Sequence, residues 1–315
     1  MANTYDRGAI LVAPHQFPDL DREHALARDF GLDLVAATDQ ASFSAAMAAA
    51  EVVMVTPYAK VTADDFAAMG RCKAVVRYGM GYDNIDVAAA AAAGIPVSIV
   101  PDASTEEVAS HAFAMGLALS RRLPQGQAAI RDGGWAGRIA YDAPKLTDLE
   151  IGVVGMGRIG RMVASSWTAI GATVHAHDPF ASFSQVPAAS LTQVLEESDV
   201  VSLHLPLTDR TRHVVSGEVL RRMRPGAVVV NVSRGGLVDE PALADALRSG
   251  HIAGAALDVF AEEPLPEGHP LRDAPNAILT PHIAWRSTTS LGALQNGAVA
   301  RARRALTGEP LIDRV

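Results

Sequence analysis

Three glycines, Gly155, Gly157 and Gly160, stand between a strand-like run and a helical run, and this setting restricts the fold more than any other feature. The apolar residues 151–154 lead into Gly155-x-Gly157-x-x-Gly160, and residues 161–170 have a helical pattern. In such a turn the first glycine allows a tight bend, the second lets the backbone approach a pyrophosphate, and the third lets helix and strand pack closely. The helix N-terminus adds unpaired N–H groups that attract phosphates. The sequence therefore predicts a dinucleotide-binding βα unit.

An acidic residue stands where such a unit needs one. A second strand-like run, residues 173–176, leads to Asp178, about 18 residues beyond the last glycine. A carboxylate at this place accepts hydrogen bonds from the adenosine ribose and repels a 2′-phosphate. The next four residues supply no arginine, and His177 is a minor cationic alternative. We therefore expect NAD(H) rather than NADP(H) as the cofactor.

Length and composition limit the remaining classes. A chain of 315 residues with 49% hydrophobic content can build two cores. Its net charge of −8, with scattered basic residues, argues against nucleic acid or an anionic membrane as a partner. The single cysteine, Cys72, cannot form an internal disulfide and is expected to be inert. No apolar stretch approaches the roughly 20 residues that span a bilayer, and no leader-like run begins the chain, so we expect a cytoplasmic protein.

The pattern of apolar and helical runs predicts an α/β fold with two doubly wound, Rossmann-like domains that have parallel sheets. The expected strands of the first series are residues 9–13, 34–36, 52–56, 74–77 and 97–100, alternating with helices at 21–30, 42–50, 63–69 and 87–93. A long helix, residues 106–122, follows and is expected to stop at Pro124. The second series has expected strands at residues 151–154, 173–176, 200–204, 227–231, 253–257 and 277–280, before a last helix at 290–306.

This order favours one domain inserted in another. The nucleotide-binding domain would comprise residues 104–285, and the substrate-binding domain residues 1–103 and 286–315. A substrate would then lie in the cleft between the two domains.

Three polar side chains follow the ends of predicted strands in the second series, where an open α/β sheet places its site. Arg234 follows the strand at 227–231, Glu263 follows 253–257, and His282 follows 277–280. One such residue is weak support, because most loop arginines and histidines are solvated or structural. Three on successive loops beyond a dinucleotide turn indicate a catalytic site.

At this point the chain resembles the D-isomer-specific 2-hydroxyacid dehydrogenase family. The resemblance rests on residues 76–86, 155–160, 204–208, 231–240, 257–266 and 280–284. Within the family, residues 77–86 and 280–287 are most similar to the C-terminal-binding-protein-like subgroup.

The resemblance implies reversible, NAD-dependent reduction of a small 2-oxo acid to the D-2-hydroxy acid. Arg234 offers a rigid fork of donors to the substrate carboxylate and ketone oxygen. His282 would be the general acid and base, because the unperturbed pKa of a histidine in general lies near the working pH. Glu263 would favour the imidazolium form of His282; it is chosen over Glu262 because the family pattern has the acid directly before a proline.

The resemblance also implies the residues that line the cofactor and the substrate. The cofactor-binding residues would be Gly155, Gly157, Arg158, Ile159, Gly160, Asp178, His204, Pro206, Thr211, Ser233, Asp258 and Thr105. The substrate-binding residues would be Tyr78, Gly79, Met80, Gly81, Arg234 and Trp285. Tyr58, Met80 and Trp285 favour an uncharged side chain on the oxo acid. The role of His111 stays open, and the motif-free histidines, such as His175 and His269, are expected to be structural or solvated.

Other readings remain open. An NAD(H)-sensing, corepressor-like binding protein would not need the Arg234, Glu263 and His282 set. A 3-phosphoglycerate dehydrogenase-type enzyme would need a phosphate site, for which residues 56–60 offer only Lys60. No metal is expected, since the ligand spacings of metal sites are missing. A homodimer is a family expectation.

Overall fold

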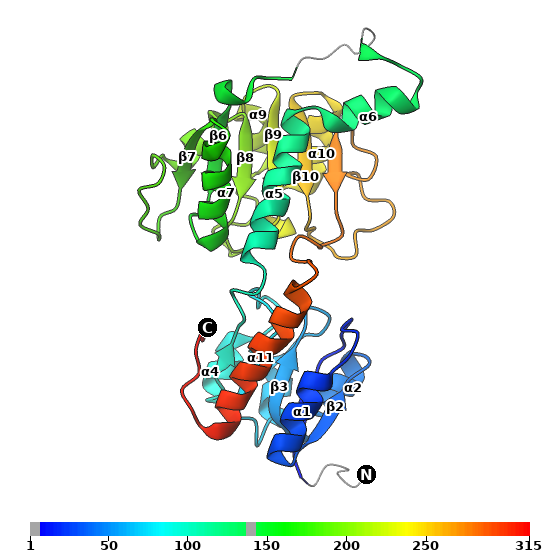
Figure 1. The fold of residues 1–315 in the computed structure, drawn as a ribbon, viewed down its shortest axis with the longest axis vertical. Helices are drawn as coiled ribbons and strands as arrows, with labels where there is room; N and C mark the ends of the chain where they lie inside the picture. Colours follow the sequence, from blue (N-terminus) through cyan, green and yellow to red (C-terminus); the bar gives the residue numbers. More distant parts are fainter. Residues whose placement is uncertain (1–6, 137–142) are drawn as a thin grey trace. The chain divides into compact units, whose positions relative to one another are not determined.

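The computed structural model describes residues 7–136 and 143–315. The chain divides into two compact units, which are considered separately: unit 1 is Met1–Ser104 with Arg286–Val315, and unit 2 is Thr105–Trp285. Each unit is a parallel sheet with helices, as Figure 1 shows. The predicted α/β fold class is confirmed.

Unit 1 has a five-stranded parallel sheet in the order β2-β1-β3-β4-β5, a doubly wound order. Its strands are β1 (Ala9–Val12), β2 (Asp33–Ala36), β3 (Ala50–Val55), β4 (Ala74–Arg77) and β5 (Val97–Ser98). Its helices are α1 (Asp21–Phe30), α2 (Gln40–Ala45), the 3-10 turn η1 (Met47–Ala49), α3 (Ala63–Ala68), α4 (Val87–Ala92) and α11 (Ser290–Thr307). The helices α1 and α11 pack against each other, so the end of the chain completes this unit (Figure 1).

A buried carboxylate joins helices α1 and α11 to the residue that follows β4. Glu23 on α1 is fully buried and accepts a 2.9 Å hydrogen bond from the Tyr78 hydroxyl. The amide of Gln295 on α11 donates to the same carboxylate at 3.3 Å. Burial, with the nearby Glu23 charge, raises the pKa of Tyr78 well above its ordinary value, so the phenol stays a donor.

Unit 2 has a six-stranded parallel sheet in the order β11-β10-β9-β8-β6-β7. Its strands are β6 (Glu150–Val154), β7 (Thr173–His177), β8 (Val200–Leu203), β9 (Ala227–Asn231), β10 (Ile252–Leu257) and β11 (Ala277–Leu279). Its helices are α5 (Thr105–Ser120), α6 (Leu123–Arg131), α7 (Arg158–Ala169), α8 (Leu191–Glu196), α9 (Gly217–Arg222) and α10 (Glu240–Arg248), with 3-10 turns η3 (Leu146–Asp148) and η4 (Gly235–Leu237). The strand order therefore reverses between β6 and β8, where such sheets bind their ligands.

Alternation along the strands of unit 2 fills two cores, one on each face of the sheet. Val153 points to the face that α5 and α7 cover, and the neighbouring Val154 points to the face that α8, α9 and α10 cover. On the first face Trp167 is fully buried, and its ring meets Phe113 edge-on at 5.1 Å between centroids.

Two sequence expectations about helices were wrong. The predicted helix 42–50 ends early, because Ala50 is the first residue of the buried strand β3. Pro124 does not simply stop a helix: α5 ends at Ser120, Arg122 has a left-handed φ of 55°, and α6 begins with Pro124 in its first turn. Proline is tolerated there because the first N–H groups of a helix have no partner within the helix.

Replacing Tyr78 by Phe should weaken unit 1, because the buried Glu23 loses a donor that water cannot replace. We expect a loss of about 1–3 kcal/mol, measured as faster hydrogen exchange in peptides from α1 and α11. Tyr82→Phe is the matched control, since Tyr82 is 39% exposed. Equal exchange in the two variants would show that the phenol does not stabilise Glu23.

Candidate active site

The glycine turn has the geometry that its sequence predicts. Gly155 has a φ of 94°, and a Cβ there would lie 2.2 Å from the His204 carbonyl oxygen. A Cβ on Gly160 would lie 1.9 Å from the Gly155 carbonyl oxygen, so helix α7 can approach the turn only with glycine. Gly157, directly before α7, differs: a Cβ there would meet no atom within 4 Å. The open space lies where a pyrophosphate would approach the helix N-terminus.

Asp178 lies at the end of β7 and is tied to the glycine turn. Its Oδ2 accepts from the Met156 N–H at 2.8 Å, and its Oδ1 accepts from the N–H groups of Phe180 and Ala181 at 2.8 and 3.0 Å. Burial raises its pKa, but these N–H groups and His177 outweigh that effect, and the net pKa is lowered. The ionised carboxylate fits ribose hydroxyls and opposes a 2′-phosphate.

His204 directly follows β8, and β8 and β6 flank the point where the strand order reverses. Its Nε2 is 2.8 Å from the Ser202 hydroxyl, while its buried Nδ1 has no hydrogen-bond partner within the described part of the chain. Burial lowers the pKa of His204 to about 3, so the ring is neutral. A neutral, partly unsatisfied imidazole beside the glycine turn fits a polar ligand such as a dinucleotide.

Several other predicted cofactor-lining residues hold the loops of the site in the structure. The Ser233 hydroxyl donates to the Leu203 carbonyl at 2.8 Å, which links the ends of β8 and β9. The Thr211 hydroxyl donates to the Pro206 carbonyl at 2.7 Å and shapes the turn after β8. Arg158 and Ile159 begin α7, and Thr105 begins α5.

Glu263 and His282 are in direct contact, although 19 residues separate them. His282 Nδ1 lies 2.7 Å from Glu263 Oε2, with side chains 42% and 37% exposed. Burial raises the pKa of Glu263, but the hydrogen bond and charge of His282, the Phe260 N–H and the charge of Arg234 outweigh it, and the net pKa is lowered. Because the ionised Glu263 binds Nδ1 of His282, the other ring nitrogen, Nε2, can exchange a proton with a substrate.

The backbone that carries His282 is held by Asp258, which is fully buried. Its carboxylate accepts from the N–H groups of Ile283 and Ala284 at 2.9 and 2.8 Å and from the Thr280 hydroxyl. Its carbonyl accepts from the His282 N–H at 2.8 Å. His282 has a left-handed φ of 55°, which is uncommon for residues other than glycine, although histidine adopts it more readily than most. The carboxylate predicted to contact the cofactor is thus engaged in positioning the His282 loop.

Two further predicted residues flank this loop. The Trp285 indole N–H donates to the His282 carbonyl at 3.0 Å. His111 on α5, whose role the sequence left open, lies 3.1 Å from the Thr280 hydroxyl through its Nε2. The first contact lies within the His282 loop, and the second joins this loop to α5.

The predicted substrate loop of unit 1 follows β4. Gly79 has a φ of 119°, and its carbonyl accepts from the Val100 N–H at 2.9 Å. Met80 is 48% exposed, whereas the Tyr78 side chain is buried on Glu23. The Tyr78 N–H donates to the Val55 carbonyl at 2.9 Å, and the Tyr78 carbonyl accepts from Arg77. These contacts hold the start of the loop, and a substrate contact by Tyr78 stays a prediction.

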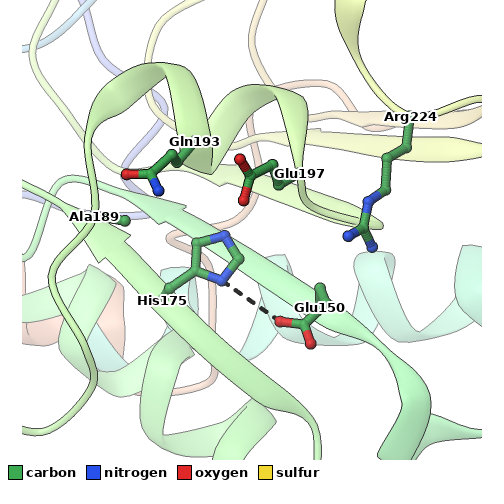
Figure 2. A pocket seen from close by; sticks show the side chains of 6 residues that line it. All are labelled: Glu150, His175, Ala189, Gln193, Glu197 and Arg224. Atoms are coloured by element: carbon green, nitrogen blue, oxygen red, sulfur yellow. Dashed lines mark ion pairs between the residues drawn. The ribbon is translucent and has the colours of Figure 1, made fainter.

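A second group of titratable side chains lies near the amino ends of the strands of unit 2, away from the glycine turn. Figure 2 shows His175 beside Glu150, with Gln193, Glu197 and Arg224 around a cavity of about 370 Å³. Burial lowers the pKa of His175, although Glu150 and Glu197 oppose this. The Ser198 hydroxyl lies 3.1 Å from His175 Nε2 but donates to the Val194 carbonyl, so this Ser-His-Glu arrangement does not activate a nucleophile.

The thiol of Cys72 is not suited to nucleophilic attack. Burial raises the pKa of Cys72 to about 12, which keeps the thiol protonated. Within residues 7–136 and 143–315, no group of three or more His, Cys, Asp or Glu side chains is arranged to hold a metal ion. No helix in the same ranges is long and apolar enough to cross a membrane.

The fold and the glycine turn define a dinucleotide-binding protein. Residues 113–284 match the NAD binding domain of the D-isomer specific 2-hydroxyacid dehydrogenases. The chain belongs to this family.

Three relatives illustrate the match. The chain is 37% identical to a D-3-phosphoglycerate dehydrogenase of Mycobacterium bovis over 88% of its length, but it spans only 53% of that protein. It is 41% identical to a glyoxylate reductase of Korarchaeum cryptofilum, covering 72% of this chain and 71% of the relative. The structure of a D-lactate dehydrogenase from Aquifex aeolicus, solved with NAD and lactic acid, has a TM-score of 0.87 and 30% identity, covering 95% of this chain and 96% of that one.

The different surroundings of two glycines give a matched test of the cofactor site. Gly157→Ala should fold with parental stability, because its Cβ meets no protein atom, but should weaken NADH binding about tenfold or more by filling the phosphate approach. Gly160→Ala should instead destabilise unit 2, because its Cβ would strike backbone. NADH fluorescence titration and urea denaturation measure the two effects. Full NADH affinity in Gly157→Ala would contradict this assignment of the phosphate approach.

Proposed function

We propose that this protein is an NAD-dependent dehydrogenase that reduces a small 2-oxo acid to the D-2-hydroxy acid. The observation that carries the proposal is the contact between His282 Nδ1 and Glu263 Oε2 at 2.7 Å, in a chain that also has a dinucleotide turn. A nucleotide sensor would need the turn but not an imidazole paired with an ionised carboxylate. Membership of the family and the NAD-bound relative support NAD as the cofactor.

The side chains divide the reaction between them. The chemistry that NADH supplies when bound is a hydride for C2 of the oxo acid. Arg234 donates to the substrate carboxylate and the ketone oxygen, which orients the substrate and polarises the carbonyl. His282 gives the Nε2 proton to the ketone oxygen during reduction and takes it back during oxidation. Glu263 stabilises the imidazolium and fixes the ring through Nδ1.

Other parts of the assignment are proposals of the same kind. Residues 104–285 bind the cofactor, while residues 1–103 and 286–315 bind the substrate. In the latter domain, Gly79, Met80 and Gly81 contact the oxo acid. The protein is a cytoplasmic homodimer, closest in character to the C-terminal-binding-protein-like subgroup.

A second candidate is a 3-phosphoglycerate dehydrogenase-type activity, which the 37% identity to the Mycobacterium bovis enzyme favours. The two candidates differ in the substrate side chain, since a phosphate needs cations that an apolar pocket does not offer.

A substrate panel tests the proposal directly. NADH oxidation is followed with glyoxylate, hydroxypyruvate, pyruvate, phenylpyruvate, 4-methylthio-2-oxobutyrate and 3-phosphohydroxypyruvate, with NADPH in parallel. We expect turnover of an uncharged-side-chain oxo acid and preference for NADH. Turnover of only the phosphorylated acid supports the second candidate, and tight NADH binding without turnover supports a sensor.

His282→Asn should lower kcat by about 10²–10⁴-fold, because the proton donor is lost while the glycine turn is intact. NADH affinity should stay close to that of the parent, which fluorescence titration checks. Near-normal turnover would remove His282 from the mechanism.

Glu263→Gln should shift the pH dependence. The hydrogen bond and charge of His282 help to lower the pKa of Glu263, so the two side chains attract each other as an ion pair. Because Gln carries no negative charge to favour a positive ring, reduction should fade at lower pH and oxidation should persist to lower pH. The kcat/KM profiles of both directions measure this, with Glu262→Gln as the matched control. An unshifted profile in Glu263→Gln would contradict the pairing.

A further inference from the structure

A second His–Glu pair lies behind the loop that carries Glu263. His269 Nε2 lies 3.1 Å from Glu240 Oε2, with the Glu240 side chain 4% exposed and that of His269 16% exposed. The other oxygen of Glu240, Oε1, accepts from the Ala261 N–H at 2.7 Å. One carboxylate thus binds a histidine with one oxygen and the backbone of the catalytic loop with the other.

Two adjacent N–H groups in that loop are bound by two different carboxylates. Phe260 donates its N–H to Glu263 Oε1 at 3.0 Å, and Ala261 donates its N–H to Glu240 Oε1. Since Glu263 Oε2 meets His282, the turn of residues 260–263 determines where the Glu263 carboxylate lies. Displacement of this turn would separate Glu263 from His282.

The same turn is packed against the loop of Arg234. A Cβ on Gly235 would lie 1.9 Å from the Phe260 carbonyl carbon and 2.1 Å from the Ala261 nitrogen, so backbone meets backbone there. Glu240 begins helix α10, six residues after Arg234. Its bond to Ala261 therefore fastens the Glu263 turn to the chain segment that carries Arg234.

We propose that Glu240 and His269 are positioning residues, which hold the turn of residues 260–263 so that Glu263 meets His282 beside Arg234. The inference rests on the proposed function for its catalytic meaning, but its geometry concerns the protein alone. Neither residue touches the reacting groups, so both act through Glu263.

Burial and the charged groups around Glu240 determine its protonation, and its bond to the Ala261 N–H lies in this buried setting. Burial raises the pKa of Glu240 most, and the charge of Glu263 raises it further, while the Ala261 N–H, His269 and His213 lower it; the net pKa is raised. These are the charged groups that face it. His269 therefore opposes the protonation of Glu240 that burial and Glu263 favour, which explains why a histidine stands there.

Hydrogen exchange tests the geometry without cofactor or substrate. In Glu240→Ala, the peptide that contains residues 260–263 should exchange at least about tenfold faster than in the parent. Glu240→Gln keeps an acceptor oxygen for the Ala261 N–H and should restore most of the protection. His269→Gln, a milder change in case Glu240→Ala folds poorly, should give an intermediate rate. Unchanged exchange in both Glu240→Ala and His269→Gln overturns the inference.

Kinetics test the consequence for Glu263. Glu240→Ala should lower kcat about tenfold or more, leave NADH affinity unchanged and move the reduction profile to lower pH, as Glu263→Gln does. A merely structural loss would reduce the active fraction without moving the pH profile. Faster exchange with an unshifted profile and parental kcat overturns the positioning role.

A matched control comes from the pair in Figure 2. His175 and Glu150 also form a His–Glu contact, at 3.7 Å, but at the amino end of the sheet. His175→Gln should leave kcat, the pH profile and exchange in residues 260–263 unchanged, and a shift as large as that of His269→Gln would overturn the specificity of the inference. If the parent turns over no oxo acid, the proposed function fails while the exchange experiment still decides the geometry.

Discussion

The site of this protein depends on the buried carboxylate of Asp258. A fully buried carboxylate is costly unless its oxygens are satisfied, and here the donors come from Thr280, Ile283 and Ala284. Those donors belong to one short loop, so satisfying Asp258 fixes the backbone on both sides of His282. The left-handed φ of His282 persists because the surrounding bonds determine it.

The other loops at the carboxyl ends of the parallel strands are also held by specific contacts with neighbouring segments. Ser233 binds the end of β8, Gly235 lets the Arg234 loop lie directly on residues 260–261, and Glu240 bonds to Ala261. Each loop is held by its neighbour rather than by the sheet alone. Such mutual support holds the side chains that we propose to be catalytic, and electrostatic catalysis requires this kind of preorganisation.

The sequence predicted what local patterns determine. Apolar runs of strand length and the glycine spacing located both sheets, and helix α1 occurs where the pattern placed it. Local patterns failed where tertiary contacts decide: Ala50 lies in an alanine run but enters β3, and Pro124 lies in the first turn of α6. The Glu240–His269 pair could not be seen, because 29 residues separate its members and no motif surrounds His269. For the same reason the bond between the Tyr78 hydroxyl and the buried Glu23 could not be predicted, since 55 residues separate the two.

The two His–Glu pairs near the site contain the same groups but differ in environment. Burial raises the pKa of both carboxylates. At Glu263 the effects of His282, Phe260 and Arg234 outweigh burial, and the net pKa is lowered. At Glu240 the lowering effects of its own partners do not outweigh burial, and the net pKa is raised. The half-exposed Glu263 thus stays ionised and can support a proton-exchanging imidazole. The buried Glu240, close to a like charge, is better suited to hold backbone. The same kind of pair, a histidine with a glutamate, therefore has two proposed roles: His282–Glu263 in acid–base chemistry and His269–Glu240 in holding the Glu263 turn. The roles differ because solvent exposure and nearby charges differ.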